Sequence, residues 1–483
     1  MNSTNSIINC TQIPLVVDLD GTLIKSDLLF ESALVFIKRN PFNILLIIKW
    51  LFSGISVLKV KLAEQISIDV ESLPYNSSFL NFLKSEHKEG RQLILATASP
   101  AIWAHKVADF LGIFSDVLAT DENINLKGTA KLEKLIFLYG EKGFDYAGDS
   151  SADIVIFSHC RNAHLINVTG STLKRSQRST IISSMTLRPS IKLFQYLKAA
   201  RLYQWTKNLL IFVPLITSHN FMNLNMFINC LLGFLAFSLC ASATYIINDL
   251  FDLTSDRLHP RKKNRCFASG ELSALRGILL IGFLGFSGLS LSFFLPVHFN
   301  FYLYIYIILT LIYSFFLKTQ VMVDVLTLAG LYTIRIFAGA QLIGVNVSFW
   351  LFAFSVFLFF GLALIKRCTE LKLILNSGKQ DVNGRNYGSN DLQTLRSMGI
   401  TSSFISVVVF ALYINSNEVL SLYSNPDLLW AIGPALLLWI NRLWIKTGRE
   451  EMHDDPIIFT LRDSVSIYIF LFIILIVVFA ELT

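Results

Sequence analysis

The sequence lacks the features that mark several classes of protein. Its six cysteines form no CxxC pair and no disulfide framework, so we expect free thiols in a reducing compartment or in lipid. The first residues carry no charged segment followed by an apolar core, and we therefore expect no signal peptide. Short-period repeats and low-complexity tracts are also lacking. The net charge of +7 is modest, and we expect no nucleic acid as a partner.

The composition changes sharply after Arg188 and Pro189. The residues before this point mix charges, glycine and short apolar runs, as a soluble α/β domain does. The residues after it form long apolar segments rich in Phe, Leu and Ile. A hydrocarbon core roughly 30 Å thick needs about 20 apolar residues per helix. We therefore predict nine membrane spans, near residues 198–216, 226–247, 274–296, 299–317, 322–343, 348–366, 400–416, 427–445 and 464–482.

Lys and Arg are distributed unevenly among the loops between these spans. Loops 217–225, 297–299, 343–348 and 417–427 contain neither residue, whereas the alternate loops are basic. By the positive-inside rule, the soluble domain and the basic loops lie in the cytoplasm and the C-terminus lies outside. We thus predict an integral protein of the inner (plasma) membrane.

Three domain segments follow from these patterns. Residues 1–173 form the soluble domain, residues 174–197 form a basic linker that faces anionic lipid, and residues 198–483 form an all-α polytopic membrane domain.

Acidic or hydroxyl side chains follow three apolar runs of the soluble domain. Asp18 and Asp20 end the first run, Thr97 ends the second, and Asp149 and Asp153 follow the third. Parallel strands place such residues at one edge of the sheet, where α/β proteins bind ligands. Lys127 and Lys131 lie between the last two motifs.

This order of motifs resembles the haloacid-dehalogenase-like phosphatases over about residues 12–170. The resemblance implies that Asp18 is the nucleophile that forms an aspartyl-phosphate and that Asp20 is the general acid/base. Thr97 would bond the phosphoryl group, and Lys131, or alternatively Lys127, would neutralise it. Asp149 and Asp153, with Asp18 and Asp20, would hold Mg²⁺. A carboxylate attacks a phosphate dianion only if a metal and a lysine offset the repulsion.

The resemblance also implies a helical cap, over about residues 27–90. Residues 41–52 of this segment are too few to span a bilayer and unusually apolar for an exposed cap. Two interpretations remain open. The cap helices either pack on each other or dip into the membrane interface to meet a lipid-linked substrate.

A second acidic cluster ends the second predicted span. Asn248, Asp249, Asp252 and Asp256 fall at helical spacing, and a basic run follows them directly. Ionisable residues at membrane depth are costly and usually mark function. Hard oxygen ligands of this kind suit Mg²⁺ that bridges to diphosphate oxygens.

The N-D-x-x-D-x-x-x-D pattern resembles the UbiA-type prenyltransferase superfamily over about residues 190–483. Aromatic prenyltransferases of this superfamily carry a second motif, D-x-x-x-D, after the fourth span, but this chain has only Asp324 there. The segments 201–208, 366–371 and 384–387, together with Arg335, look like those of decaprenyl-phosphate 5-phosphoribosyltransferases. Two departures, Leu202-Tyr203 in place of a proline and Cys266 in place of another, leave the substrate open.

Together these patterns predict a bifunctional membrane enzyme with Mg²⁺ as cofactor. The membrane domain would transfer 5-phosphoribose from phosphoribosyl diphosphate to a polyprenyl phosphate, and the soluble domain would remove the 5-phosphate. We expect this reaction to belong to cell wall biosynthesis. The residues expected to bind substrate are Lys207, Asn208, Arg257, Lys262, Arg265, Lys318, Asp324 and Arg335. Two alternatives stay open: prenyl transfer to an aromatic acceptor, and a lipid-carrier binding protein with a vestigial phosphatase. Membrane lipid is a partner in each case, and the sequence leaves homo-oligomerisation open.

Overall fold

The fold was analysed in a computed structural model, which describes residues 13–120, 125–178, 180–259, 261–376, 386–416, 419, 422–452 and 455–482. The chain divides into two compact units. The first unit comprises residues 1–199 and 247–279, and the second comprises residues 200–246 and 280–483. The predicted segment Gly384-Arg385 lies outside the described residues.

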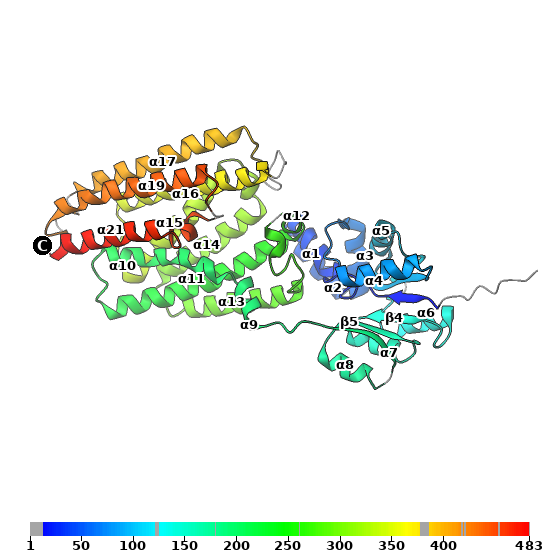
Figure 1. The fold of residues 1–483 in the computed structure, drawn as a ribbon. Coiled ribbons are helices and arrows are strands. Elements are labelled where there is room, and N and C mark those ends of the chain that lie inside the picture. The colour runs from blue at the N-terminus through cyan, green and yellow to red at the C-terminus, as the bar shows by residue number, and fades with distance from the viewer. Residues whose placement is uncertain are drawn as a thin grey trace, which may run out of the picture. The chain divides into compact units, whose positions relative to one another are not determined.

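The first unit contains a parallel six-stranded sheet in the order β3-β2-β1-β4-β5-β6 (Figure 1). Its strands are β1 (Leu15–Val17), β2 (Leu93–Pro100), β3 (Asp116–Thr120), β4 (Asp145–Gly148), β5 (Ala163–Val168) and β6 (Ile182–Leu187). Strand β1 is central, and Val16 pairs with Ile94 on one side and Tyr146 on the other. All three of these residues are fully buried, as expected of strands covered on both faces. The α/β prediction is therefore confirmed.

Further helices of the sheet domain connect or follow these strands. They are α5 (Ala101–Leu111), α6 (Thr129–Tyr139), η1 (Ser151–Asp153), α7 (Ile154–Phe157) and α8 (Gly170–Ser176). Helix α6 follows Gly128, and it carries Lys131 on a buried face. This placement directs a lysine toward the end of the central strand.

Four helices lie between β1 and β2, where the cap was predicted. They are α1 (Leu28–Arg39), α2 (Asn43–Phe52), α3 (Ile55–Gln65) and α4 (Ser77–Lys88). Helix α2 has no buried residue, and its Ile47 and Trp50 are only partly buried against the core. Trp50 stacks on Phe36 of α1 with ring centroids 5.4 Å apart. One face of α2 thus packs on the cap, and the apolar residues Ile44, Leu45, Ile48, Leu51 and Phe52 remain exposed.

The segment predicted as a basic linker contains an element of the sheet. Strand β6 lies within residues 174–197 and pairs with β5, for example Leu165 with Met185. Helix α9 (Leu193–Ala199) follows in the same unit. The sheet therefore continues past residue 173, where we placed the end of the soluble domain.

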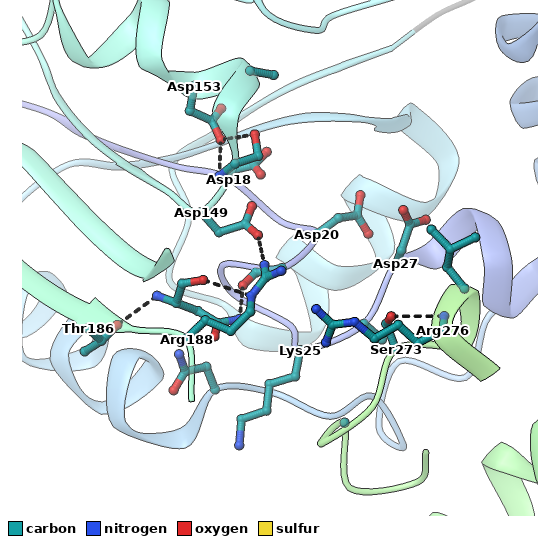
Figure 2. A pocket seen from close by; sticks show the side chains of 18 of the residues that line it. Asp18, Asp20, Lys25, Asp27, Asp149, Asp153, Thr186, Arg188, Ser273 and Arg276 are labelled. Carbon is teal, nitrogen blue, oxygen red and sulfur yellow. Dashed lines mark hydrogen bonds and ion pairs between the residues drawn. The ribbon is translucent and has the colours of Figure 1, made fainter. Parts of the chain in front are cut away.

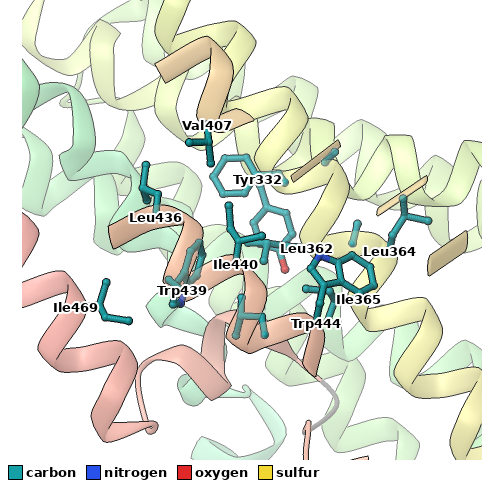
Figure 3. Close-up of a cluster of buried hydrophobic side chains, with 14 of the residues drawn as sticks. Tyr332, Leu362, Leu364, Ile365, Val407, Leu436, Trp439, Ile440, Trp444 and Ile469 are labelled. Carbon is teal, nitrogen blue, oxygen red and sulfur yellow. The ribbon is translucent and has the colours of Figure 1, made fainter. Parts of the chain in front are cut away.

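The second unit is helical. The structure contains eight helices long and apolar enough to cross a membrane among the described residues. They are α11 (Leu224–Phe251), α13 (Ala274–Ser292), α14 (Val297–Phe315), α15 (Val323–Ile343), α16 (Phe349–Asn376), α17 (Asp391–Ile414), η5 (Pro426–Ala431) continued by α19 (Ile432–Gly448), and α21 (Ser464–Leu482). Buried residues of α15, α16, α17, α19 and α21 form one apolar core, in which Tyr332, Ile440 and Trp444 lie close together (Figure 3).

Short helices replace the first predicted span. Residues 198–216 form the end of α9, then η2 (Leu202–Phe212) and α10 (Val213–Thr217). Polar residues of η2 are buried inside the unit, among them Lys207 and Asn208. Burial of paired polar groups explains why this apolar-rich segment does not form one long helix. Further short elements of the chain are α12 (Leu253–Leu258), η3 (Lys262–Asn264), η4 (Leu317–Thr319) and α20 (Pro456–Thr460).

Candidate active site

The predicted nucleophile lies at the carboxyl end of the central strand. Asp18 follows β1 directly, and its backbone N–H donates to the carbonyl of Ala147 in β4 (2.9 Å). Lys131 Nζ donates to Asp18 Oδ1 at 2.8 Å. Lys131 also donates to the hydroxyl of Tyr146 at 3.1 Å. Of the two predicted lysines, the structure therefore brings Lys131 to the nucleophile, while Lys127 lines the cavity around it.

Three carboxylates converge beside the nucleophile. One oxygen each of Asp18, Asp149 and Asp153 lies within 4.8 Å of the others, and all three residues are buried. Ser150 donates its backbone N–H (3.0 Å) and its hydroxyl (2.6 Å) to Asp153 Oδ2, which fixes that side chain. Three converging hard oxygen donors suit Mg²⁺. Asp18, Asp149 and Asp153 thus fit the predicted ion.

Gly21 provides the space for Asp149. Its φ angle is +81°, and a Cβ at this position would lie 2.3 Å from Asp149 Oδ2. Arg188, directly after β6, donates to the same oxygen at 2.8 Å. The carboxylate is therefore held between a glycine turn and an arginine that the sequence analysis assigned to the linker.

Asp20, which we also predicted as a metal ligand, does not belong to the group of three converging carboxylates. The backbone N–H of Leu28 donates to Asp20 Oδ1 (2.9 Å), and the hydroxyl of Ser99 donates to Oδ2 (2.6 Å). The predicted phosphate-binding Thr97 is fully buried, and its Oγ1 accepts the backbone N–H of Ser99 at 3.0 Å. Thr97 thus positions Ser99, and of these two residues Ser99 lines the cavity.

Asp18, Asp20 and Asp149 have pKa values above the usual range for aspartate. Burial raises the pKa of Asp18 to about 6, although Lys131 opposes the shift. Burial, with the negative charge of Asp27, raises the pKa of Asp20 to about 7. Burial, with Asp18 and Asp153, raises the pKa of Asp149 to about 8. A crowd of buried carboxylates is stabilised by a divalent cation, and a carboxyl with a pKa near 7 suits proton transfer at neutral pH.

These residues line one cavity of about 750 Å³. Figure 2 shows Asp18, Asp149 and Asp153 grouped at one side of it and Asp20 and Asp27 at another. Residues 269–276, which follow the second acidic cluster in the sequence, also line the cavity. Its size is in the usual range for small-molecule sites and exceeds the need of a phosphoryl group alone.

In the second acidic cluster, two of the three aspartates converge on the same arginine, and the third binds elsewhere. Arg265 Nη1 donates to Asp249 Oδ1 (2.9 Å) and to Asp256 Oδ2 (2.6 Å), so these two carboxylates converge on a single cationic group. Asp252 instead accepts from Lys38 of α1 at 2.9 Å. Arg265 therefore occupies the point at which the Asp249 and Asp256 carboxylates meet. Asn248, which directly precedes Asp249 in α11, is half-buried.

Two basic residues after this cluster differ in their surroundings. Arg257 makes a paired contact with the Glu31 carboxylate of α1, at 2.9 and 2.5 Å. Lys262 lies half-buried in η3. We predicted both residues as substrate contacts. In the structure, the Arg257 guanidinium is bound to the Glu31 carboxylate of the protein itself.

Asp324 is paired within the second unit. Its Oδ2 accepts from Arg367 Nε and its Oδ1 accepts from the Tyr387 hydroxyl, both at 2.5 Å. Arg367 also donates to Glu370 (2.5 Å) and Tyr313 (2.9 Å). Both oxygens of the carboxylate are therefore occupied by side chains of the protein.

The remaining predicted contacts of the second unit are also engaged by the protein. Lys207 forms an ion pair with Asp455, which precedes α20. Arg335 donates to Asn208 Oδ1 (2.7 Å) and to the Tyr306 hydroxyl (3.2 Å). Lys318 lies half-buried in η4.

Comparison with known proteins identifies both parts of the chain. Residues 210–462 match the UbiA prenyltransferase family, and residues 15–154 match haloacid dehalogenase-like hydrolases. The chain belongs to the UbiA prenyltransferase family. It is an integral membrane protein with a haloacid dehalogenase-like domain, as the sequence analysis predicted.

Three relatives of this UbiA family member bear on its function. The uncharacterized protein y4nM of Sinorhizobium fredii is 36% identical over 95% of this chain and 89% of its own. Nodulation protein NoeC of Azorhizobium caulinodans is 30% identical over 57% of this chain and 90% of its own. Decaprenyl-phosphate phosphoribosyltransferase of Mycolicibacterium smegmatis is 28% identical over 44% of this chain and 69% of its own. The last two are similar to part of the chain only.

Sequence reasoning missed four residues of this UbiA family member's sites. Ser99 and Arg188 contact the phosphatase carboxylates, and Asp455 and Arg367 pair with predicted substrate residues. Ser99 belongs to a run of hydroxyl residues that ends β2, so its position carried a signal. The other three reach their partners over 39 to 248 positions of sequence, and spacing alone does not indicate such pairs.

Proposed function

We propose that this protein is a bifunctional membrane enzyme. The UbiA domain transfers 5-phosphoribose from phosphoribosyl diphosphate to a polyprenyl phosphate, and the haloacid dehalogenase-like domain removes the 5-phosphate. The observation that carries the proposal is the complete phosphatase constellation around Asp18, with Lys131, Asp149 and Asp153, on a chain that also carries Asp249 and Asp256. The similarity to decaprenyl-phosphate phosphoribosyltransferase supports the substrates.

In the transfer step, an oxygen of the polyprenyl phosphate forms a bond to C1 of the ribose, and the bond from C1 to the diphosphate breaks. Asp249 and Asp256 hold the position at which Mg²⁺ would stabilise the departing diphosphate. Arg265 already bridges these carboxylates, and its guanidinium is placed to contact the same leaving group.

In the hydrolysis step, the Asp18 carboxylate attacks the phosphorus of the 5-phosphate and displaces the ribose hydroxyl. Asp20 gives a proton to that leaving oxygen and then takes one from the water that hydrolyses the aspartyl-phosphate. Its raised pKa, about 7, fits a group that both donates and accepts. Lys131 neutralises negative charge on the Asp18 carboxylate that attacks the phosphorus. Mg²⁺ on Asp18, Asp149 and Asp153 would offset the repulsion between carboxylate and phosphate.

Prenyl transfer to an aromatic acceptor is the second candidate. Against it, Asp324 is the single acidic residue of the region that carries the second aspartate-rich motif, and Arg367 and Tyr387 occupy both of its oxygens. A carboxylate bound in this way is unsuited to hold a metal.

The test uses purified full-length protein in detergent with Mg²⁺, labelled phosphoribosyl diphosphate and polyprenyl phosphate. Thin-layer chromatography of the lipid fraction should show labelled polyprenyl-phosphoryl ribose. A parallel reaction with polyprenyl diphosphate and a hydroxybenzoate tests the second candidate. Prenylated benzoate without lipid-linked ribose would refute the proposal.

A further inference from the structure

The cavity around Asp18 has a wall that does not come from the phosphatase fold. Residues 269–276 follow the second acidic cluster and belong to the same compact unit as the sheet. Gly270 has a φ of +77°, and a Cβ there would lie 2.8 Å from Cβ of Lys25. The close approach of backbone to the Lys25 stem fixes this wall against the turn that follows Asp20.

Three of the six cationic side chains that line the cavity are engaged with protein groups. Lys131 pairs with Asp18, Arg188 pairs with Asp149, and Lys59 donates to the carbonyl of Ala98 at 2.6 Å. Each of these groups therefore stabilises the catalytic end itself.

Arg276 differs from these cations. It lies in the first turn of α13, where its backbone N–H donates to Ser273 Oγ at 3.5 Å. Arg276 is half-buried, and its guanidinium has no hydrogen bond or ion pair to any residue that the structure describes. Figure 2 shows the Arg276 side chain pointing into the cavity, whereas the Lys25 side chain extends away from it. A half-buried, unpaired guanidinium with five donors is a binding group for an anion.

The cavity thus has two chemically different ends. The Asp18 end suits a phosphomonoester, and the Arg276 end suits a second, separate anion. The product of the proposed transfer has both groups, because its ribose carries a 5-phosphate and a phosphodiester at C1. We propose that Arg276 binds this phosphodiester and makes the phosphatase selective for the lipid-linked sugar phosphate. The inference rests on the proposed function, and it assigns a phosphatase specificity residue to the first turn of α13, which lies within the residues that match the UbiA family.

The test compares two soluble substrates on the full-length protein with Mg²⁺. One is ribose 5-phosphate, and the other is ribose 5-phosphate with a short alkyl phosphodiester at C1. For Arg276→Ala we expect KM for the diester substrate to rise about tenfold or more, the loss of one hydrogen bond to a charged group. Its kcat, and both constants for ribose 5-phosphate, should stay unchanged. Arg276→Lys should recover part of the affinity.

Arg261→Ala is the matched control, because this arginine of the same basic region is exposed and does not line the cavity. It should leave both substrates unaffected. If Arg276→Ala changes neither substrate, or weakens both equally, the inference is refuted. If the rise in KM of Arg276→Ala depends on the anionic lipid content of the preparation, Arg276 binds lipid headgroups, and the inference is also refuted. Wild-type protein that hydrolyses neither compound would instead contradict the phosphatase half of the proposed function.

Discussion

The outward face of helix α2 gives a test of how the phosphatase reaches a membrane-bound substrate. Ile44, Ile48 and Phe52 lie on this face, and they are 47%, 44% and 90% exposed. The other side of the helix packs on the cap through Ile47 and Trp50. The perturbation is the joint change of Ile44, Ile48 and Phe52 to Ser, which removes apolar surface without touching the packed side.

The size of the effect follows from the exposed area. The three exposed fractions amount to a little under two whole side chains, and full burial of one is worth roughly 1.5–3 kcal/mol. Insertion of this face into the membrane interface would therefore contribute roughly 3–5 kcal/mol to docking. Since about 1.4 kcal/mol corresponds to a factor of ten, the docked population can fall more than tenfold in the variant.

The assay follows phosphate release in proteoliposomes from the 5-phosphorylated lipid and, separately, from a small soluble phosphate ester. We expect the triple variant to hydrolyse the lipid at least tenfold more slowly and the soluble ester at the normal rate. Lys49→Ser, an exposed but charged position of the same helix, is the control and should change neither rate. An equal fall of both rates, or an unfolded cap by circular dichroism, would show that these residues stabilise the fold and would refute membrane docking.

Four further outcomes are expected. Asp18→Asn should stop dephosphorylation and leave transfer intact, because an amide cannot form the aspartyl-phosphate; chromatography should show the 5-phosphorylated lipid, and a wild-type product mixture would contradict this. Asp249→Ala should abolish formation of lipid-linked ribose while hydrolysis of a soluble ester survives, since one of two converging carboxylates is lost; normal lipid product would disprove its role. Gly21→Ala should remove phosphatase activity, because the new Cβ would lie 2.3 Å from Asp149 and the left-handed backbone costs an alanine about 1–2 kcal/mol; retained activity would show that the turn adapts. Arg367→Met should destabilise the membrane domain by about 3–5 kcal/mol, because Asp324 is left buried without its cation; an unchanged melting temperature in detergent would refute that account.

Local sequence was sufficient for three of the six strands and for the three carboxylates that converge beside β1. Strand β1 is a short apolar run, and parallel pairing places Asp18 and Asp149 at adjacent strand ends whatever the rest of the chain does. Eight of the predicted spans match long helices, because an apolar run of membrane length has few alternatives.

Features that depend on distant partners could not be predicted in the same way. Strand β6 lies within the basic stretch that we interpreted as a linker, and only its pairing with β5 shows that it belongs to the sheet. The first predicted span is broken because Lys207 and Asn208 are buried against Asp455 and Ser238. Asp252 has the helical spacing of a metal ligand, yet Lys38 binds it. Each of these outcomes is decided by a residue far away in the sequence.

Strand β6 also determines where this fusion protein can be divided. The strand completes one edge of the sheet, and Arg188 directly after it holds the Asp149 carboxylate. A gene fragment that stops at residue 173 would encode all four phosphatase motifs and still lose this arginine. A free-standing phosphatase cut from this chain must therefore extend at least to Arg188, so that it ends only a few residues before α9, the first helix that follows.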